Sequence, residues 1–160
     1  MSTFIQERLR QLREDEDSRS SDRSWLQHAD SVFKAKAHSL WEQVVSTAQD
    51  RVTEWNEGLG RPNHARRAKL DLIPSERLKA FCHIYPLVHI TVWLDRDDQS
   101  LRYEVQRKLD SGSLSTIQGG RMPIKLLEAD GELHVYDGCA SVPDISTAVE
   151  LILSPLFSSS

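Results

Sequence analysis

Apolar side chains recur every three or four residues between Trp25 and Glu57, and this is the strongest pattern in the chain. Such spacing places one apolar stripe along an α-helix. A side-chain oxygen of Ser21 or Asp22 can cap the start, and Gly58 can take the left-handed conformation that ends a helix. The pattern predicts one long amphipathic helix over residues 25–57. Its apolar members are Trp25, Ala29, Val32, Phe33, Ala37, Leu40, Trp41, Val44, Val45, Ala48, Val52 and Trp55.

Two different segments precede this helix. Residues 4–13 carry Phe4, Ile5, Leu9 and Leu12 at helix-like spacing, but a helix this short is marginal in water without a packing partner. Residues 14–24 contain no apolar side chain and are rich in acidic residues, which indicates a hinge or mobile linker, or alternatively an acidic interaction tail. We therefore expect a short helix and acidic linker over residues 1–24, followed by a single α+β domain over residues 25–160.

Beyond Pro62 the apolar period changes to about two, as in β-strands. Residues 87–94 and 101–109 both alternate, and the polar residues between them predict a hairpin turn. Residues 69–73 predict a short first strand. The segment 75–85 is ambiguous, because a helix can begin at Ser75 while the alternation from Leu78 favours a strand, and we take the strand.

The last third of the chain continues this pattern and then returns to a helical one. Strands are expected near residues 114–118 and 122–127, with a bulge or bend at Gly119-Gly120, and Asp130-Gly131 predicts a tight hairpin. Residues 141–144 resemble a capping box for a short amphipathic helix that Pro155 would end.

This order predicts an α+β fold in which a long N-terminal helix packs on an antiparallel meander of about five strands, followed by a short C-terminal helix. The arrangement is similar to cystatin-like or TBP-like architectures, which is a likeness of shape that carries no function. A helix over residues 25–57 would be about 50 Å long, whereas a strand of eight residues spans about 26 Å. Half of the apolar stripe would therefore need another cover, which the N-terminal segment, the C-terminal helix or a second subunit could supply. Of these we expect a second subunit, in a homodimer.

Composition and charge indicate an ordinary soluble protein. The chain has 160 residues, a net charge of -4 and two cysteines, Cys82 and Cys139. Two thiols do not make a secreted disulfide framework, and neither a signal peptide nor an apolar run of bilayer length is visible. We expect a cytoplasmic protein that does not bind membranes.

One face of the predicted sheet carries the candidate chemistry. If Val88 and Ile90 point toward the helix, polar and aromatic side chains gather on the opposite face. They can be cross-strand pairs that stabilise the sheet, or they can hold a small ligand or a protein partner. The proposed ligand-binding residues are His89, Trp93, Glu104, His134 and Tyr136.

An enzyme is the alternative, with His89 or His134 as general base and Glu104 orienting the imidazole. Strand register decides whether these three groups meet, and no nucleophile motif accompanies them. Cys82, His83 and His89 do not form a metal site if adjacent residues point to opposite faces, so no metal or other cofactor is expected. The only basic cluster, residues 61–69, lies in a net acidic chain, which disfavours nucleic-acid binding.

We therefore interpret the sequence as that of a non-enzymatic binding protein. The expected partners are another protein, a small ligand, or a second copy of the chain.

Overall fold

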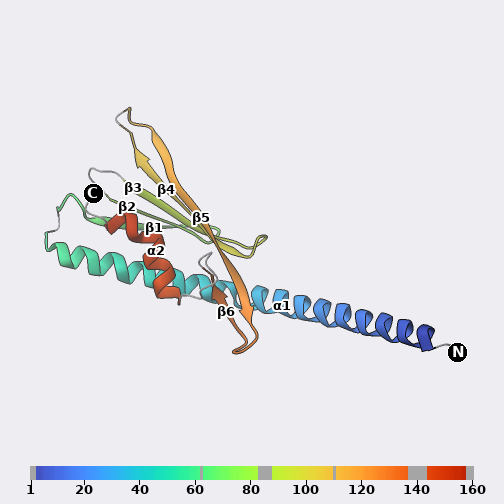
Figure 1. The fold of residues 1–160 in the computed structure, drawn as a ribbon. Coiled ribbons are helices and arrows are strands. Elements are labelled where there is room, and N and C mark those ends of the chain that lie inside the picture. Colours follow the sequence, from blue (N-terminus) through green and yellow to red (C-terminus); the bar gives the residue numbers. More distant parts are fainter. Residues whose placement is uncertain (1–2, 62, 83–87, 110, 137–143, 158–160) are drawn as a thin grey trace.

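The structure is a computed structural model that describes residues 3–61, 63–82, 88–109, 111–136 and 144–157. It contains one very long helix, a sheet and a short helix near the C-terminus (Figure 1). This confirms the predicted α+β fold, with six strands in place of about five. The elements are α1 (Thr3–Leu59), β1 (Ala68–Ile73), β2 (Arg77–Cys82), β3 (Val88–Asp95), β4 (Ser100–Lys108), β5 (Leu114–Leu127), β6 (Glu132–Val135) and α2 (Ile145–Phe157).

The six strands form an antiparallel meander in chain order. Both helices lie on the same side of this sheet (Figure 1): α1 contacts β1, β5 and β6, and α2 contacts β2, β3 and β6. We call the face toward the helices the inner face and the opposite one the outer face.

The core lies between the inner face and the helices. On β3 the predicted alternation is confirmed, because Val88, Ile90, Val92 and Leu94 are buried while the residues between them are half-buried. The stripe of α1 is buried only from Phe33 onward. Its buried members are Phe33, Ala37, Leu40, Trp41, Val44, Ala48 and Val52.

The apolar stripe that was expected to need a second subunit is covered within the chain. The sheet and α2 together cover the α1 stripe through Val52, so that part of the helix leaves no large apolar surface for a second subunit. The uncovered part is the N-terminal half, in which every residue from Thr3 to His28 is exposed.

The prediction of a linker over residues 14–24 is wrong, because α1 runs through this segment without a break. The segment lacks apolar residues, but its charges are spaced to support a helix: Arg10 precedes Glu14 by four residues, and Arg13 precedes Asp17 by four. Opposite charges at this spacing lie side by side on a helix surface. The predicted caps at Ser21 and Asp22 are therefore interior helix positions.

The end of α1 also differs from the prediction. Gly58 is still helical, and Gly60 has the positive φ of 73°. The Gly60 amide donates hydrogen bonds to the Asn56 and Glu57 carbonyls at 3.3 and 3.2 Å. Gly60 is therefore the residue that terminates the helix.

In the sheet, residues 77–82 form a strand, as we preferred from the alternation after Leu78. The two segments expected around Gly119-Gly120 are one continuous strand, β5, whose pairing with β4 shifts between Val105 and Gln106. Gly120 lies against Tyr103, whose phenol group would overlap a Cβ at that position. The absence of a side chain there makes room for the Tyr103 ring.

The short helix α2 begins after Asp144, whose carboxylate accepts a hydrogen bond from the Thr147 amide at 2.7 Å. Ser141, the other end of the predicted capping box, lies outside the described residues. Pro155 does not end the helix as predicted but lies in its last turn. Proline has no N–H that could donate to the Leu151 carbonyl four residues earlier. The Ser154 hydroxyl donates a hydrogen bond to that oxygen instead, at 3.0 Å.

A candidate binding face on the sheet

The strand register aligns the outer-face residues of β2, β3, β4 and β5 in rows across the sheet. His89 is opposite Phe81 and Gln106, and Trp93 is opposite Arg77 and Arg102. Side chains that are opposite each other in one row lie close enough to contact each other. The outer-face residues on these strands include Arg77, Lys79, Phe81, His89, Thr91, Trp93, Arg102, Glu104, Gln106, Thr116 and Arg121.

The row through Trp93 combines one aromatic ring with three arginines. The Arg77 guanidinium lies over the Trp93 ring, 5.5 Å from its centroid. A cation held over an indole face is attracted by the ring quadrupole. On the other side of Trp93, Arg102 is opposite Arg121 on β5.

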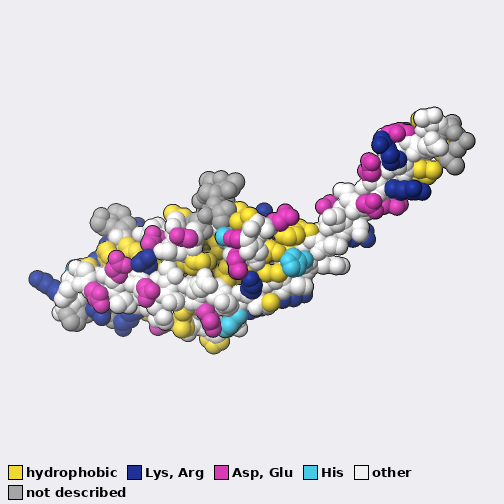
Figure 2. Space-filling view, turned by 90° about the horizontal axis from the view of Figure 1, so that it is seen from below, with side chains coloured by type: hydrophobic (Ala, Val, Ile, Leu, Met, Phe, Trp, Pro, Cys, Tyr) yellow, Lys and Arg dark blue, Asp and Glu magenta, His cyan; other side chains and the backbone are white. Residues whose placement is uncertain are grey.

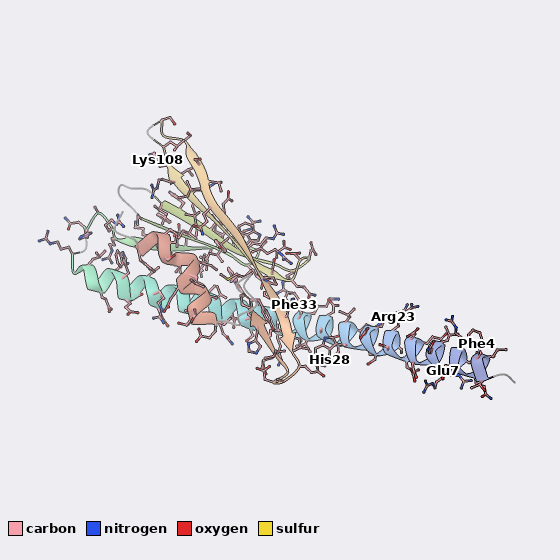
Figure 3. All side chains as sticks on the ribbon, in the orientation of Figure 1. Phe4, Glu7, Arg23, His28, Phe33 and Lys108 are labelled. Carbon is pink, nitrogen blue, oxygen red and sulfur yellow. The ribbon has the colours of Figure 1, made fainter. Side chains whose placement is uncertain are left out.

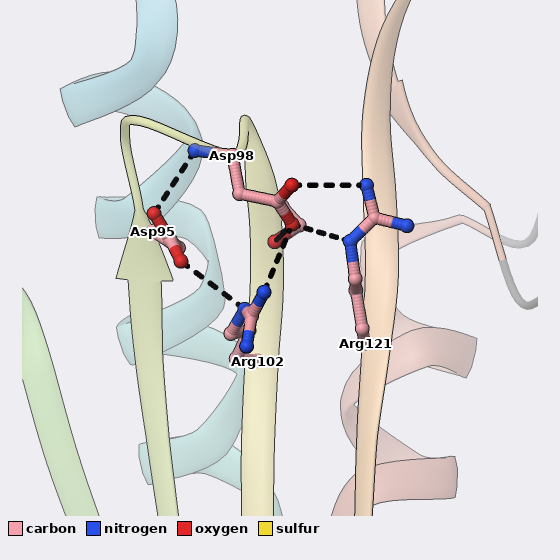
Figure 4. A network of polar contacts seen from close by, with 5 residues as sticks. Asp95, Asp98, Arg102 and Arg121 are labelled. Carbon is pink, nitrogen blue, oxygen red and sulfur yellow. Dashed lines mark hydrogen bonds and ion pairs between the residues drawn. The ribbon is translucent and has the colours of Figure 1, made fainter.

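Arg102 and Arg121 are held by carboxylates at the end of β3 and in the turn that follows it (Figure 4). Arg102 pairs with Asp95 at 3.1 Å and with Asp98 at 3.4 Å. Arg121 also pairs with Asp98, and Ser100 donates a hydrogen bond to the same carboxylate at 2.7 Å. The hydrogen bonds from Arg121 and Ser100 are the main causes that lower the pKa of Asp98 to about 2. These two arginines therefore have their charge compensated within the protein.

His89 is stacked on Phe81, with ring centroids 5.4 Å apart and an interplanar angle of 12°. Both of its ring nitrogens are buried and have no hydrogen-bond partner among the described residues. Burial is the main cause that lowers the pKa of His89, and the positive charges of Lys79 and Lys108 lower it further. The imidazole is therefore neutral at pH 7 and contributes a flat surface rather than a charge.

Glu104 lies on the same face, opposite Thr91 and diagonal to His89. Its carboxylate accepts a hydrogen bond from the Thr116 hydroxyl on β5, whereas no hydrogen bond links it to either ring nitrogen of His89. Glu104 thus does not orient the imidazole as the enzyme hypothesis requires.

His134 lies away from these groups. It is opposite Lys125, whereas Glu104 is opposite Gly119. Those two positions are six residues apart on β5, which is about 20 Å of extended strand. The His134 ring is 2.7 Å from the Asp130 carboxylate in the β5–β6 hairpin.

Tyr136 follows β6, and the Lys125 ammonium lies 5.6 Å from the centroid of its ring. The five residues chosen from the sequence therefore fall into two groups. His89, Trp93 and Glu104 share the central outer face, and His134 and Tyr136 lie at the far end of β5.

Sequence reasoning missed the contribution of β2 to the central group. Arg77, Lys79 and Phe81 are the outer-face residues of this strand, and their alternation with Leu78 and Ala80 was visible in the sequence. The ambiguity between helix and strand in segment 75–85 hid them.

Two of the hollows on the described part of the molecule lie between the helices and their neighbours. One, of about 450 Å³, lies between α1, β6 and the start of α2, and its main charged groups are already paired, Lys36 with Glu132 and His134 with Asp130. The other, of about 650 Å³, lies between the ends of α1 and α2 over Trp55 and Phe157. Neither presents the combination of an aromatic ring and an uncompensated cation found around Trp93.

Among residues of the described ranges, no cluster of three or more histidine, cysteine, aspartate or glutamate side chains could hold a metal ion. Cys82 faces the core and His89 the outer face, while His83 lies outside the described residues. In the part of the chain that the structure describes, no helix combines the length and apolar character needed to cross a bilayer.

No protein-family model matches the chain, and neither a curated protein nor a solved structure is significantly similar to it.

Proposed function

We propose that the protein is a non-enzymatic binding protein that holds its partner against the central outer face of the sheet. The observation that carries this proposal is the Arg77–Trp93 pair, which lies on the face that neither helix covers. Around it, Phe81 and His89 add a second flat surface. Aromatic rings beside a few polar groups are typical of binding surfaces.

The charges of this face indicate what chemistry it would accept. Asp95, Asp98 and Glu104 are engaged by neighbouring side chains. Arg77, in contrast, makes no ion pair with any residue in the described ranges and stays exposed. A guanidinium can remain stacked on an indole while it donates to a carboxylate or phosphate. The face therefore suits a protein segment or small molecule that carries a flat or apolar group beside a negative charge.

No observation favours the enzyme alternative to a similar degree. It needs Glu104 to orient the ring of a general-base histidine. Glu104 makes no hydrogen bond with either ring nitrogen of His89, and His134 lies at the far end of β5.

Photo-crosslinking in cells tests this proposal, with a photoreactive residue placed at one of two positions of the full chain. A photoreactive residue at Thr91 lies on the outer face, and one at the exposed Ser46 on α1 is the matched control. We expect a specific adduct from position 91 and none from position 46. We also expect Arg77→Gln combined with Trp93→Leu to reduce the adduct about tenfold, the effect of losing one interaction hot spot.

Native mass spectrometry of the same preparations reports co-purified small molecules. A bound species that is retained by the Arg77→Gln/Trp93→Leu variant, or adducts that are equal at positions 91 and 46, would contradict the proposal. Absence of any adduct and any bound species would count against it as well.

A further inference from the structure

The N-terminal end of α1 carries four large apolar side chains that are exposed. Phe4 is 69% exposed, Ile5 49%, Leu9 42% and Leu12 55%. We call these four residues the tip stripe. Their spacing places them along one side of the helix. Figure 2 shows apolar side chains near the end of the projecting arm, next to basic and acidic ones.

The described body of the same chain does not cover the tip stripe. Every residue from Thr3 to His28 is exposed, and this half of α1 projects from the sheet. Phe4 lies near its N-terminal end, and Phe33 lies where the helix reaches the core (Figure 3). A projecting helix with an exposed apolar stripe gains stability when a partner buries that stripe.

The tip stripe is bordered by two opposite charges. The hollow on this part of the helix is lined by Phe4, Ile5, Leu9 and Leu12 together with Arg8 and Asp15. Arg8 and Asp15 are seven residues apart, or about two turns, so they lie on the same side of the stripe. This surface has an apolar centre with a positive end and a negative end.

We propose that a second copy of the chain covers the tip stripe, with the two α1 tips packed side by side in antiparallel orientation. A two-fold axis near residues 10 and 11 brings Leu9 of each copy next to Leu12 of the other. The same rotation places Arg8 of each copy near Asp15 of the other, so the surface is complementary to itself.

Parallel pairing of the same surface is disfavoured by charge. Flanking positions of parallel helices meet five residues apart, which would bring Arg8 of one copy against Arg13 of the other. The apolar repeat would also place Glu16 against Glu16 at the next core position. Antiparallel pairing avoids both repulsions and places the acidic block 14–17 near the positive N-terminal end of the partner's helix dipole.

The two bodies do not meet in this arrangement, and the interface between the tips is small. An overlap of residues 4–17 uses about 20 Å of each helix, and residues 18–28 then separate the overlap from both bodies. Four partly exposed side chains on each copy place the interface at the low end of protein interface sizes. The dimer is therefore a reversible one, populated at micromolar and higher concentrations, and it leaves the outer face of each sheet open.

The test is sedimentation velocity of the full chain and its charge variants at up to about 300 μM, a range chosen for an interface of this size. Arg8→Glu and Asp15→Arg each create two repulsions across the antiparallel pair. We expect each variant alone to self-associate at least about tenfold more weakly than the native chain. In a mixture of the two variants, positions 8 and 15 carry opposite charges at both contacts of the mixed pair, so we expect the mixture to recover association.

Leu9→Gln and Leu26→Gln form a matched pair of controls. Both residues are exposed leucines of the projecting helix, but Leu26 lies outside the overlap. Only Leu9→Gln should weaken association, and circular dichroism should show that both variants keep the native helix content.

Several results would overturn the proposal. These are a native chain that stays monomeric at the highest concentration, charge variants that fail to recover association on mixing, and equal losses from the two leucine variants. Binding of the monomeric native chain, but not of Leu9→Gln, to vesicles of mixed anionic and zwitterionic lipids would overturn it by assigning the tip stripe to a membrane surface.

Discussion

Tyr103 and Gly120 show how a single position constrains the sheet. The two residues are opposite each other on β4 and β5, and the Tyr103 ring extends over the Gly120 backbone. A Cβ at Gly120 would overlap the phenol group, with the ring carbon Cε1 only 2.6 Å away. Adjacent Gly119 has only an ordinary contact of 3.6 Å to the Tyr103 carbonyl oxygen. The two glycines therefore differ in how much room they leave for a side chain.

Gly120→Ala should lower the free energy of unfolding by about 1–3 kcal/mol, as overpacking does, because the ring must move or the strands must separate. Gly119→Ala is the matched control and should change it by less than about 1 kcal/mol. Combining Gly120→Ala with Tyr103→Leu should cost less than the sum of the single changes, because the shorter side chain removes the clash. Urea unfolding of these variants and the native chain measures the differences, and additive costs would contradict the proposed contact.

At the level of helices and strands, the features that depend on apolar periodicity were predicted from the sequence. Alternation identified β3 and β4 and the face each residue takes, because the strands have one buried and one solvated side. The continuity of α1 was not predicted, because residues 14–24 are helical without an apolar stripe. Opposite charges spaced four apart, such as Arg13 and Asp17, are compatible with a helix in this segment.

The candidate site was predicted only in part for a related reason. Periodicity gives the face of a side chain but not the register between strands. Register decides that Trp93 meets Arg77 and Arg102, and that His134 lies about 20 Å of strand away from Glu104. No local pattern in the sequence fixes those pairings across the sheet.

At the end of α1, replacing either of two glycines by alanine should change the free energy of unfolding, in opposite directions. Gly58 is helical and Gly60 has a positive φ, and no atom lies within 4 Å of the position a Cβ would take at either. Gly58→Ala should raise the free energy of unfolding by about 0.5–1 kcal/mol, because alanine restricts the unfolded chain and favours the helix. Gly60→Ala should lower it by about 1 kcal/mol, because the left-handed conformation is strained for alanine. Thermal and urea unfolding measure both changes, and the same sign at both positions would contradict this helix end.

At the scale of the whole molecule, a body that buries its own core is joined to an exposed helix end. Residues from Phe33 onward belong to the body, and Thr3 to His28 form the projecting half of α1 (Figure 1). The two proposals concern surfaces at different places, the outer face of the sheet and the tip stripe. Between them α1 runs as one continuous helix.

A distance measured between two labels on α1 tests whether this helix is rigid. Fluorescent dyes at Gln11→Cys and Asp50→Cys, both exposed sites, are separated by 39 residues of helix, or about 59 Å. Cys139→Ser removes one native thiol, while burial raises the pKa of the Cys82 thiol and protects it from labelling. Single-molecule energy transfer at concentrations far below those of the dimer should give one narrow population near that distance. A broad or much shorter distribution, as a hinge over residues 14–24 would produce, would show that α1 is not one rigid helix.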